Sequence, residues 1–136
     1  RGTPERPGVV LGLDRGGTCI GVLYQLPVSG RHAALAQLFK REMPVWEDRV
    51  YRPSELGARL GDGSSVRALA FVAERSSRSY RRMPEEEVLA RLRDSHGLRG
   101  PNRDYAINTW QALQARGVRD SKLERIARLL AVDLAD

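Results

Sequence analysis

The amino-acid sequence predicts an α+β fold. Segments of strand-type composition fill much of its first half, helix-type segments fill its second half, and one helix lies between the strands. With 136 residues, of which 41% are apolar and 29% charged, the chain has the size and composition of one globular domain. We therefore predict a single domain over residues 1–136, and it contains no apolar run long enough to span a membrane.

A hairpin is predicted over residues 9–26, because β-branched and aromatic residues flank a glycine-containing turn at 14–17. Residues 49–52 are predicted to be extended, and Pro53 is expected at a sheet edge or outside the ladder. A turn rich in glycine and serine then leads to the clearest strand, residues 66–73.

The first two helices have recognisable ends. The first is predicted to end at Glu42, because Pro44 blocks its continuation, and Ser29 is expected to cap its start. The second opens at Pro84, which acidic residues follow in the first turn, and Gly97 is expected to end it.

Two further helices complete the second half. Asn102 is expected to cap the third helix, and Gly117 to close it. The fourth is predicted to start near Asp120 or Ser121, with Glu124 placed for a capping box. The residues of its predicted core face are Leu123, Ile126, Leu129 and Leu130.

Glu42 is the candidate catalytic residue. Leu35, Leu38 and Phe39 share one helix face, so Glu42 falls where this helix runs out. The last turn of a helix carries partial negative charge, which disfavours an ionised carboxylate by about 0.3–1 kcal/mol. A carboxylate in such a place is a better proton acceptor. The alternative interpretation is an ordinary exposed glutamate at a frayed helix end, near Arg41.

The net charge of +6 comes almost wholly from arginine. The arginines are scattered along the chain and interleaved with acidic residues, and few aromatic residues accompany them. This pattern does not favour a nucleic-acid surface, so no nucleic-acid partner is expected. A small anionic substrate is one alternative, and plainly solvated arginines are the other.

The single cysteine, Cys19, excludes an internal disulfide and is expected to be a small buried residue in a cytoplasmic protein. The two histidines, His32 and His96, lack the spacing of metal ligands. The sequence contains no phosphate-binding glycine loop, no G-x-S-x-G elbow and no His-Glu-x-x-His motif. No metal or other cofactor is therefore expected.

Five motifs follow one another along nearly the whole chain. They are Arg-Gly-Thr-Pro-Glu-Arg-Pro-Gly at 1–8, Gly-Leu-Asp-x-Gly-Gly-x-Cys-x-Gly-Val at 12–22, Arg-Glu-Met at 41–43, Ala-Leu-Ala-Phe-Val-Ala at 68–73 and Asn-x-Asp-Tyr at 102–105. The octapeptide and the Arg-Glu-Met are the most specific of them. Together they resemble the ChaC family, γ-glutamylcyclotransferases that act on glutathione.

The resemblance implies a γ-glutamylcyclotransferase-like mixed β-barrel with flanking helices. It also implies a reaction in which the γ-glutamyl α-amine attacks its own side-chain amide, releasing 5-oxoproline and Cys-Gly. One glutamate serves as the general acid and base in this family, and it matches Glu42. Tyr105 matches a tyrosine that lines the substrate pocket, and Arg1, Gly2 and Thr3 are expected to line it as well.

One part of the family pattern does not occur in residues 1–136. Family members begin with a strand and a Gly-Tyr-Gly-Ser-Leu-like loop whose backbone amides hold the γ-glutamyl group, so we expect the chain to be N-terminally incomplete. The alternative function is a non-catalytic domain of the same fold that binds a small anionic γ-glutamyl metabolite. A basic RNA-binding module is a more distant third.

Overall fold

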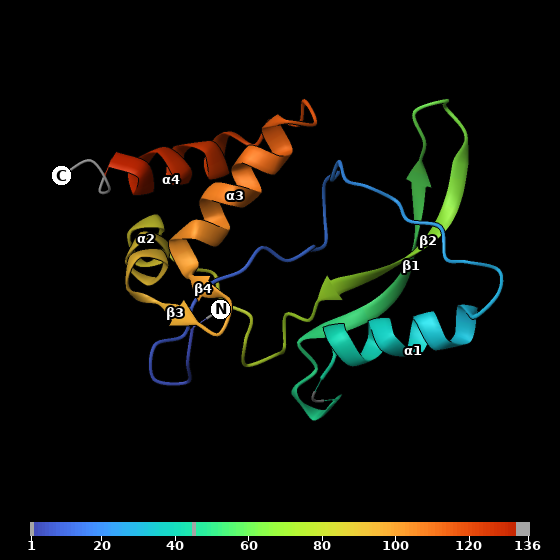
Figure 1. Ribbon diagram of the computed structural model, residues 1–136, viewed down its shortest axis with the longest axis horizontal. Coiled ribbons are helices and arrows are strands. Elements are labelled where there is room, and N and C mark those ends of the chain that lie inside the picture. Colours follow the sequence, from blue (N-terminus) through green and yellow to red (C-terminus); the bar gives the residue numbers. More distant parts are fainter. Residues whose placement is uncertain (1, 45, 133–136) are drawn as a thin grey trace. The chain divides into compact units, whose positions relative to one another are not determined.

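The computed structural model describes residues 2–44 and 46–132, and the α+β class predicted from the sequence is confirmed (Figure 1). The elements in chain order are α1 (Arg31–Glu42), the short 3-10 helix η1 (Trp46–Asp48), β1 (Tyr51–Arg59), β2 (Ser65–Ala73), α2 (Glu85–Asp94), β3 (His96–Gly97), β4 (Gly100–Pro101), α3 (Asn102–Gln114) and α4 (Ser121–Val132). Each of the two sheets found in the described residues has two strands. No helix in this described part of the chain is long and apolar enough to cross a membrane.

The chain divides into two compact units. The sheet unit is Gly12–Arg81 and contains α1, β1 and β2. The helical unit joins the N-terminal segment up to Leu11 with everything from Arg82 onward, including α2, α3 and α4.

An antiparallel ladder between β1 and β2 forms the sheet unit, running from Tyr51 opposite Ala73 to Arg59 opposite Ser65. The turn between the strands closes through a hydrogen bond from the Leu60 N–H to the Ser64 carbonyl. The strand expected at 66–73 is therefore confirmed. Pro53 lies inside β1, which is an outer strand of its sheet, and the edge position predicted for it is confirmed.

Helix α1 lies beside the β1–β2 sheet (Figure 1). It packs on this sheet through Phe39, whose ring meets the Phe71 ring edge-to-face with centroids 5.3 Å apart. The helix ends at Glu42, as predicted. The predicted Ser29 cap is wrong: Gly30 occupies the cap position in a left-handed conformation, with φ of 79°, and no side chain caps the helix. Glycine adopts this conformation without a Cβ penalty, so the chain turns there instead.

The hairpin predicted over residues 9–26 is wrong. Only Leu13 makes a bridge, in parallel with Val72, and its carbonyl accepts from the Ala73 N–H at 2.7 Å. Residues 14–26 have strand-type composition but no strand in the structure, and Ile20 and Tyr24 are exposed. Strand propensity records how well side chains fit a paired, half-buried sheet, so it does not create pairing by itself.

Cys19 lies in this segment and is exposed, so its predicted burial is wrong for the same reason.

A charged cluster holds the loop after Leu13 to the segment that follows β2. Arg75 donates two hydrogen bonds to the Asp14 carboxylate, at 2.9 and 3.2 Å, and a third to the Arg15 carbonyl. The Tyr80 hydroxyl donates to the same carboxylate at 2.8 Å. The Arg75 guanidinium, followed by Tyr80, holds the pKa of Asp14 well below its usual range. The cluster therefore joins two segments about 60 residues apart by hydrogen bonds to a charged group.

The helical unit has the buried core of the chain. α2, α3 and α4 pack together around Leu89, Leu92, Ala106, Leu123, Ile126 and Leu130. Val9 of the N-terminal segment is partly buried against the same cluster. Of the predicted α4 face, three members are buried, whereas Leu129 remains 41% exposed.

The ends of the helices are partly as expected. Gly117 closes α3 in a left-handed conformation, and its N–H donates to the Gln114 carbonyl. Asp120 caps α4, because its carboxylate accepts from the Leu123 N–H at 2.9 Å. The predicted end of α2 at Gly97 is wrong: the helix stops at Asp94, and Gly97 belongs to the small β3–β4 ladder.

We predict that Leu130→Ala lowers the free energy of unfolding by about 2–5 kcal/mol, because it leaves a cavity in a closely packed core. Leu129→Ala is the matched control on the same helix, and since that side chain is 41% exposed we expect a loss of about 1 kcal/mol or less. Urea denaturation of the two variants measures the difference. Equal losses would contradict the placement of the core.

The charged cluster predicts a pH-dependent contribution to stability. The pKa of Asp14 is lower in the folded than in the unfolded protein, so its contribution is complete above the unfolded-state value of about 4 and is lost as the pH falls. We expect the stability difference between wild type and Asp14→Asn to be constant near neutral pH and to shrink between about pH 5 and pH 2. Urea titrations at several pH values test this, and a difference that does not depend on pH would refute it.

Candidate functional site

Glu42, the predicted catalytic residue, is the last residue of α1 in the sheet unit. Its carboxylate accepts a hydrogen bond from the Arg41 Nε at 2.7 Å, and its side chain is 28% exposed. The helix stops because the Met43 N–H still bonds to the Phe39 carbonyl while Pro44 cannot continue the pattern. The carboxylate is therefore partly accessible, and one neighbouring cation is in contact with it.

The Glu42 carboxylate forms an ion pair with Arg41. Arg41 is itself 68% exposed, so solvent weakens the attraction between the two. This contact was expected for an ordinary glutamate at a helix end, and the catalytic role of Glu42 stays a prediction.

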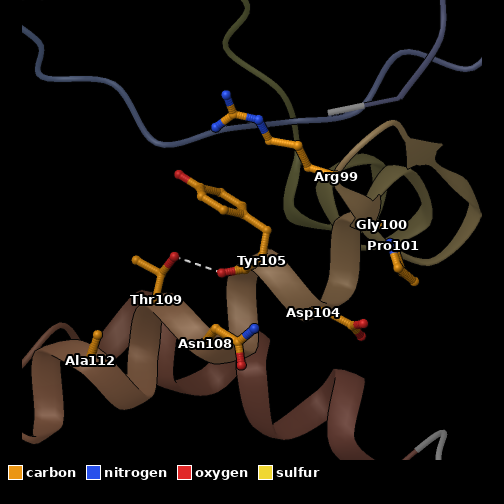
Figure 2. Close-up of a pocket in the computed structure, with 8 residues that line it drawn as sticks. All are labelled: Arg99, Gly100, Pro101, Asp104, Tyr105, Asn108, Thr109 and Ala112. Carbon is orange, nitrogen blue, oxygen red and sulfur yellow. Dashed lines mark hydrogen bonds between the residues drawn. The ribbon is translucent and has the colours of Figure 1, made fainter.

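Tyr105 lies in the first turns of α3, in the helical unit. Its hydroxyl accepts a hydrogen bond from the Leu11 N–H at 3.0 Å. Its backbone carbonyl accepts from the Thr109 hydroxyl at 2.6 Å, four residues further along the helix (Figure 2). The ring is half-buried and lies between the helix and the N-terminal segment.

The contact that Asn102 makes with the N-terminal segment was not predicted from the sequence. Asn102 was expected to cap α3, but it is the first residue of that helix and Pro101 takes the cap position without a side-chain hydrogen bond. Its amide instead pairs with Val9: it accepts from the Val9 N–H at 2.6 Å and donates to the Val9 carbonyl at 2.8 Å. The whole residue is 0% exposed. The available signal was its spacing from Tyr105, which places both side chains near the same helix face.

Gly2 and Thr3 belong to a closed turn at the start of the N-terminal segment. The Thr3 N–H donates to the Arg6 carbonyl at 3.0 Å, and the Thr3 hydroxyl accepts from the Arg6 N–H at 3.2 Å. Gly2 has φ of 94°, and a Cβ there would lie 2.4 Å from the Arg6 carbonyl oxygen. Glycine is therefore required for the turn itself. Arg1, the third candidate in this segment, lies outside the described residues.

A hollow of about 550 Å³ lies beside Tyr105 on α3 (Figure 2). It is lined by Arg99, Gly100, Pro101, Asp104, Tyr105, Asn108, Thr109 and Ala112. In Figure 2 the Arg99 and Tyr105 side chains extend to the same side of the helix, whereas Asp104 points away from them. A hollow of this size is in the range that small-molecule sites occupy, and it presents both a cation and hydroxyl groups.

The structure brings Tyr105 together with the N-terminal segment inside the helical unit, while Glu42 belongs to the sheet unit. Across residues 2–44 and 46–132, no group of three histidine, cysteine, aspartate or glutamate side chains could hold a metal ion.

Comparison with known proteins gives the family. The profile described as ChaC-like protein matches residues 1–132. The glutathione-specific gamma-glutamylcyclotransferase of Escherichia coli (strain K12) is 32% identical over 141 residues, covering 100% of this chain and 60% of the bacterial protein. Gamma-glutamylcyclotransferase 2-3 of Arabidopsis thaliana is 25% identical over 134 residues, covering 93% of this chain and 67% of the plant protein. The chain thus spans about 60% of the length of its bacterial relative, and it belongs to the ChaC-like family.

Proposed function

We propose that the protein containing this chain cleaves glutathione to 5-oxoproline and Cys-Gly as a γ-glutamylcyclotransferase. The observation that carries the proposal is the family match over residues 1–132, together with 32% identity to a bacterial enzyme named for this activity. The motifs at 1–8, 41–43 and 102–105 point to the same chemistry.

The reaction is internal to the substrate. The α-amine nitrogen attacks the γ-amide carbonyl carbon and forms the ring C–N bond. The tetrahedral intermediate then breaks the bond to the cysteine nitrogen, which leaves as the amine of Cys-Gly. Nucleophile and electrophile belong to one molecule, so the protein contributes orientation, proton transfer and stabilisation of the oxyanion.

Glu42 is the proposed general acid and base. The α-amine is largely protonated near neutral pH and becomes nucleophilic only when a base takes its proton. The same carboxyl group then delivers that proton to the leaving nitrogen, so one residue serves both steps. The position of Glu42 at the end of α1, with 28% of its side chain exposed, supports this role because a substrate amine is able to reach it.

Substrate contacts are proposed for Tyr105, Gly2, Thr3 and Arg1. Glutathione carries two carboxylates, and backbone N–H groups and arginine side chains are the natural partners of such groups. The hollow beside Tyr105 supports the proposal, because Arg99 adds a cation to its lining.

The complete fold is proposed to be a γ-glutamylcyclotransferase-like barrel with flanking helices, in a single cytoplasmic domain. The bridge between Leu13 and Val72 supports it, because Val72 also pairs with Arg52 of β1. β2 therefore accepts partners along both of its edges, as an inner strand of a larger sheet does.

We predict that Glu42→Gln lowers kcat for glutathione by about 100-fold or more, because glutamine keeps the shape of the side chain but cannot carry the proton. Binding of glutathione, measured by calorimetry, should change little. Production of 5-oxoproline is the readout for the intact protein. A Glu42→Gln protein with a near wild-type rate would exclude Glu42 as the acid/base.

The matched control is Glu55→Gln. Glu55 is also in the sheet unit and also pairs with an arginine, Arg67, at 2.6 Å, but its side chain is 61% exposed on β1. We expect wild-type kcat from this variant. An equal loss in both variants would point to a general effect of removing a carboxylate. Turnover-free binding of glutathione by the wild-type protein would instead favour the non-catalytic alternative.

We further predict that turnover needs no added metal ion, since the proposed proton transfers use one carboxyl group and the substrate's own amine. Assays before and after treatment with a chelator should give equal rates. Loss of activity that a single divalent ion restores would contradict the mechanism.

A further inference from the structure

We propose that Asn102 and Tyr105 are positioning residues that clamp the N-terminal segment, residues 2–11, onto α3, and that this clamp sets the affinity for the substrate. The inference rests on the proposed function for its substrate. It divides the proposed role of Tyr105: the residue lines the hollow as a substrate contact, whereas its hydroxyl acts through Leu11 and the rest of the segment.

Three hydrogen bonds form the clamp. The Asn102 amide accepts from the Val9 N–H at 2.6 Å and donates to the Val9 carbonyl at 2.8 Å. The Tyr105 hydroxyl accepts from the Leu11 N–H at 3.0 Å. In an extended chain the backbone groups of alternate residues point to the same edge, so two side chains on one helix face can hold residues 9 and 11 together.

The Asn102 amide takes the place of a neighbouring strand. It meets both backbone groups of Val9, as a paired residue in a sheet does, and it is 0% exposed. Its own N–H bonds to the Ser95 carbonyl at 2.9 Å, which fixes the start of α3 beneath it. Removing the amide would leave two backbone groups of Val9 without these partners, and such losses are expensive in buried places.

The clamp also governs the turn that precedes it. Residues 2–8 form one closed unit through the bonds between Thr3 and Arg6 and the bridge between Gly2 and Pro7. A substitution that releases Val9 or Leu11 therefore moves the whole turn, including the proposed substrate contacts at Gly2 and Thr3. A change in substrate affinity is the expected consequence, because the proposed contacts belong to this turn.

Hydrogen exchange at single amides, measured by NMR on the intact protein, tests the clamp without any need for turnover. Tyr105→Phe keeps the ring and removes one acceptor, so the Leu11 amide should exchange about 3- to 10-fold faster while the rest of α3 keeps its protection. Asn102→Asp keeps an acceptor for the Val9 N–H but places a carboxylate against the Val9 carbonyl, so both Val9 and Leu11 should lose protection. Tyr80→Phe is the control, because it removes a hydroxyl of the sheet unit that bonds to Asp14.

The affinity for glutathione is measured in the Glu42→Gln background, where the ligand is not consumed. We expect Tyr105→Phe and Asn102→Asp to raise Kd by about 3-fold or more, and Tyr80→Phe to leave it unchanged. Unchanged exchange at Leu11 in Tyr105→Phe would overturn the clamp. Weaker binding with unchanged exchange would assign Tyr105 to direct substrate contact, and faster exchange with unchanged Kd would remove the segment from the site; either result overturns the inference.

The Tyr105→Phe variant keeps the test valid if Asn102→Asp fails to fold. The two proposals are also separable. Absence of 5-oxoproline from the unsubstituted protein, with the exchange and affinity pattern as expected, would refute the proposed function and leave the clamp standing.

Discussion

The helical unit depends on one buried amide. Asn102 pairs with both backbone groups of Val9, and Val9 in turn packs against the core formed by α2, α3 and α4. A polar side chain that is 0% exposed is favourable only when its hydrogen bonds are made. The buried Asn102 amide therefore requires the N-terminal segment to pass beside it, and the segment is held there by the same bonds. Residues 2–8 are joined to α3 through Val9 by this constraint, even though Val9 and Asn102 lie 93 residues apart in sequence.

In the sheet unit, helix packing and helix length fix the position of the Glu42 carboxylate. Phe39 packs α1 on the sheet through Phe71, and Glu42 follows one turn later at the end of the helix. Because Pro44 prevents another turn, the carboxylate stays at the helix terminus, in contact with Arg41. The proposed proton transfer requires a carboxylate that a substrate can reach, and this side chain is 28% exposed.

The sequence was informative where local signals decide the structure. Proline and glycine marked the ends of α1 and α3, and periodic apolar residues gave the strand at 66–73 and the core face of α4. The sequence was misleading where the local structure depends on a partner that is distant in sequence. Residues 18–26 have the composition of a strand, yet none of them lies in a strand, and the nearest bridge joins Leu13 to Val72. Asn102 shows the same effect: its position suggested a local cap, but the partly buried backbone of Val9, 93 residues away, bonds to both groups of its amide. The residues next to Asn102 in sequence do not show whether its amide caps α3 or pairs with the Val9 backbone.

The proposed reaction is an internal cyclisation, which makes unequal demands on a protein. Bond formation needs a single proton carrier, because the amine and the carbonyl belong to the same molecule. Most of the remaining free energy must then come from holding a flexible, anionic substrate in the reactive conformation, and that depends on how rigidly the contacting segments are themselves held. The turn at residues 2–8 is closed by its own hydrogen bonds before any ligand arrives, and Gly2 makes that closure sterically possible. These internal bonds do not fix the position of the turn relative to α3. The side chains of Asn102 and Tyr105 fix it through their hydrogen bonds to the backbone of Val9 and Leu11. Under the proposed function, Asn102 and Tyr105 contribute to substrate affinity by holding the backbone of the N-terminal segment in place.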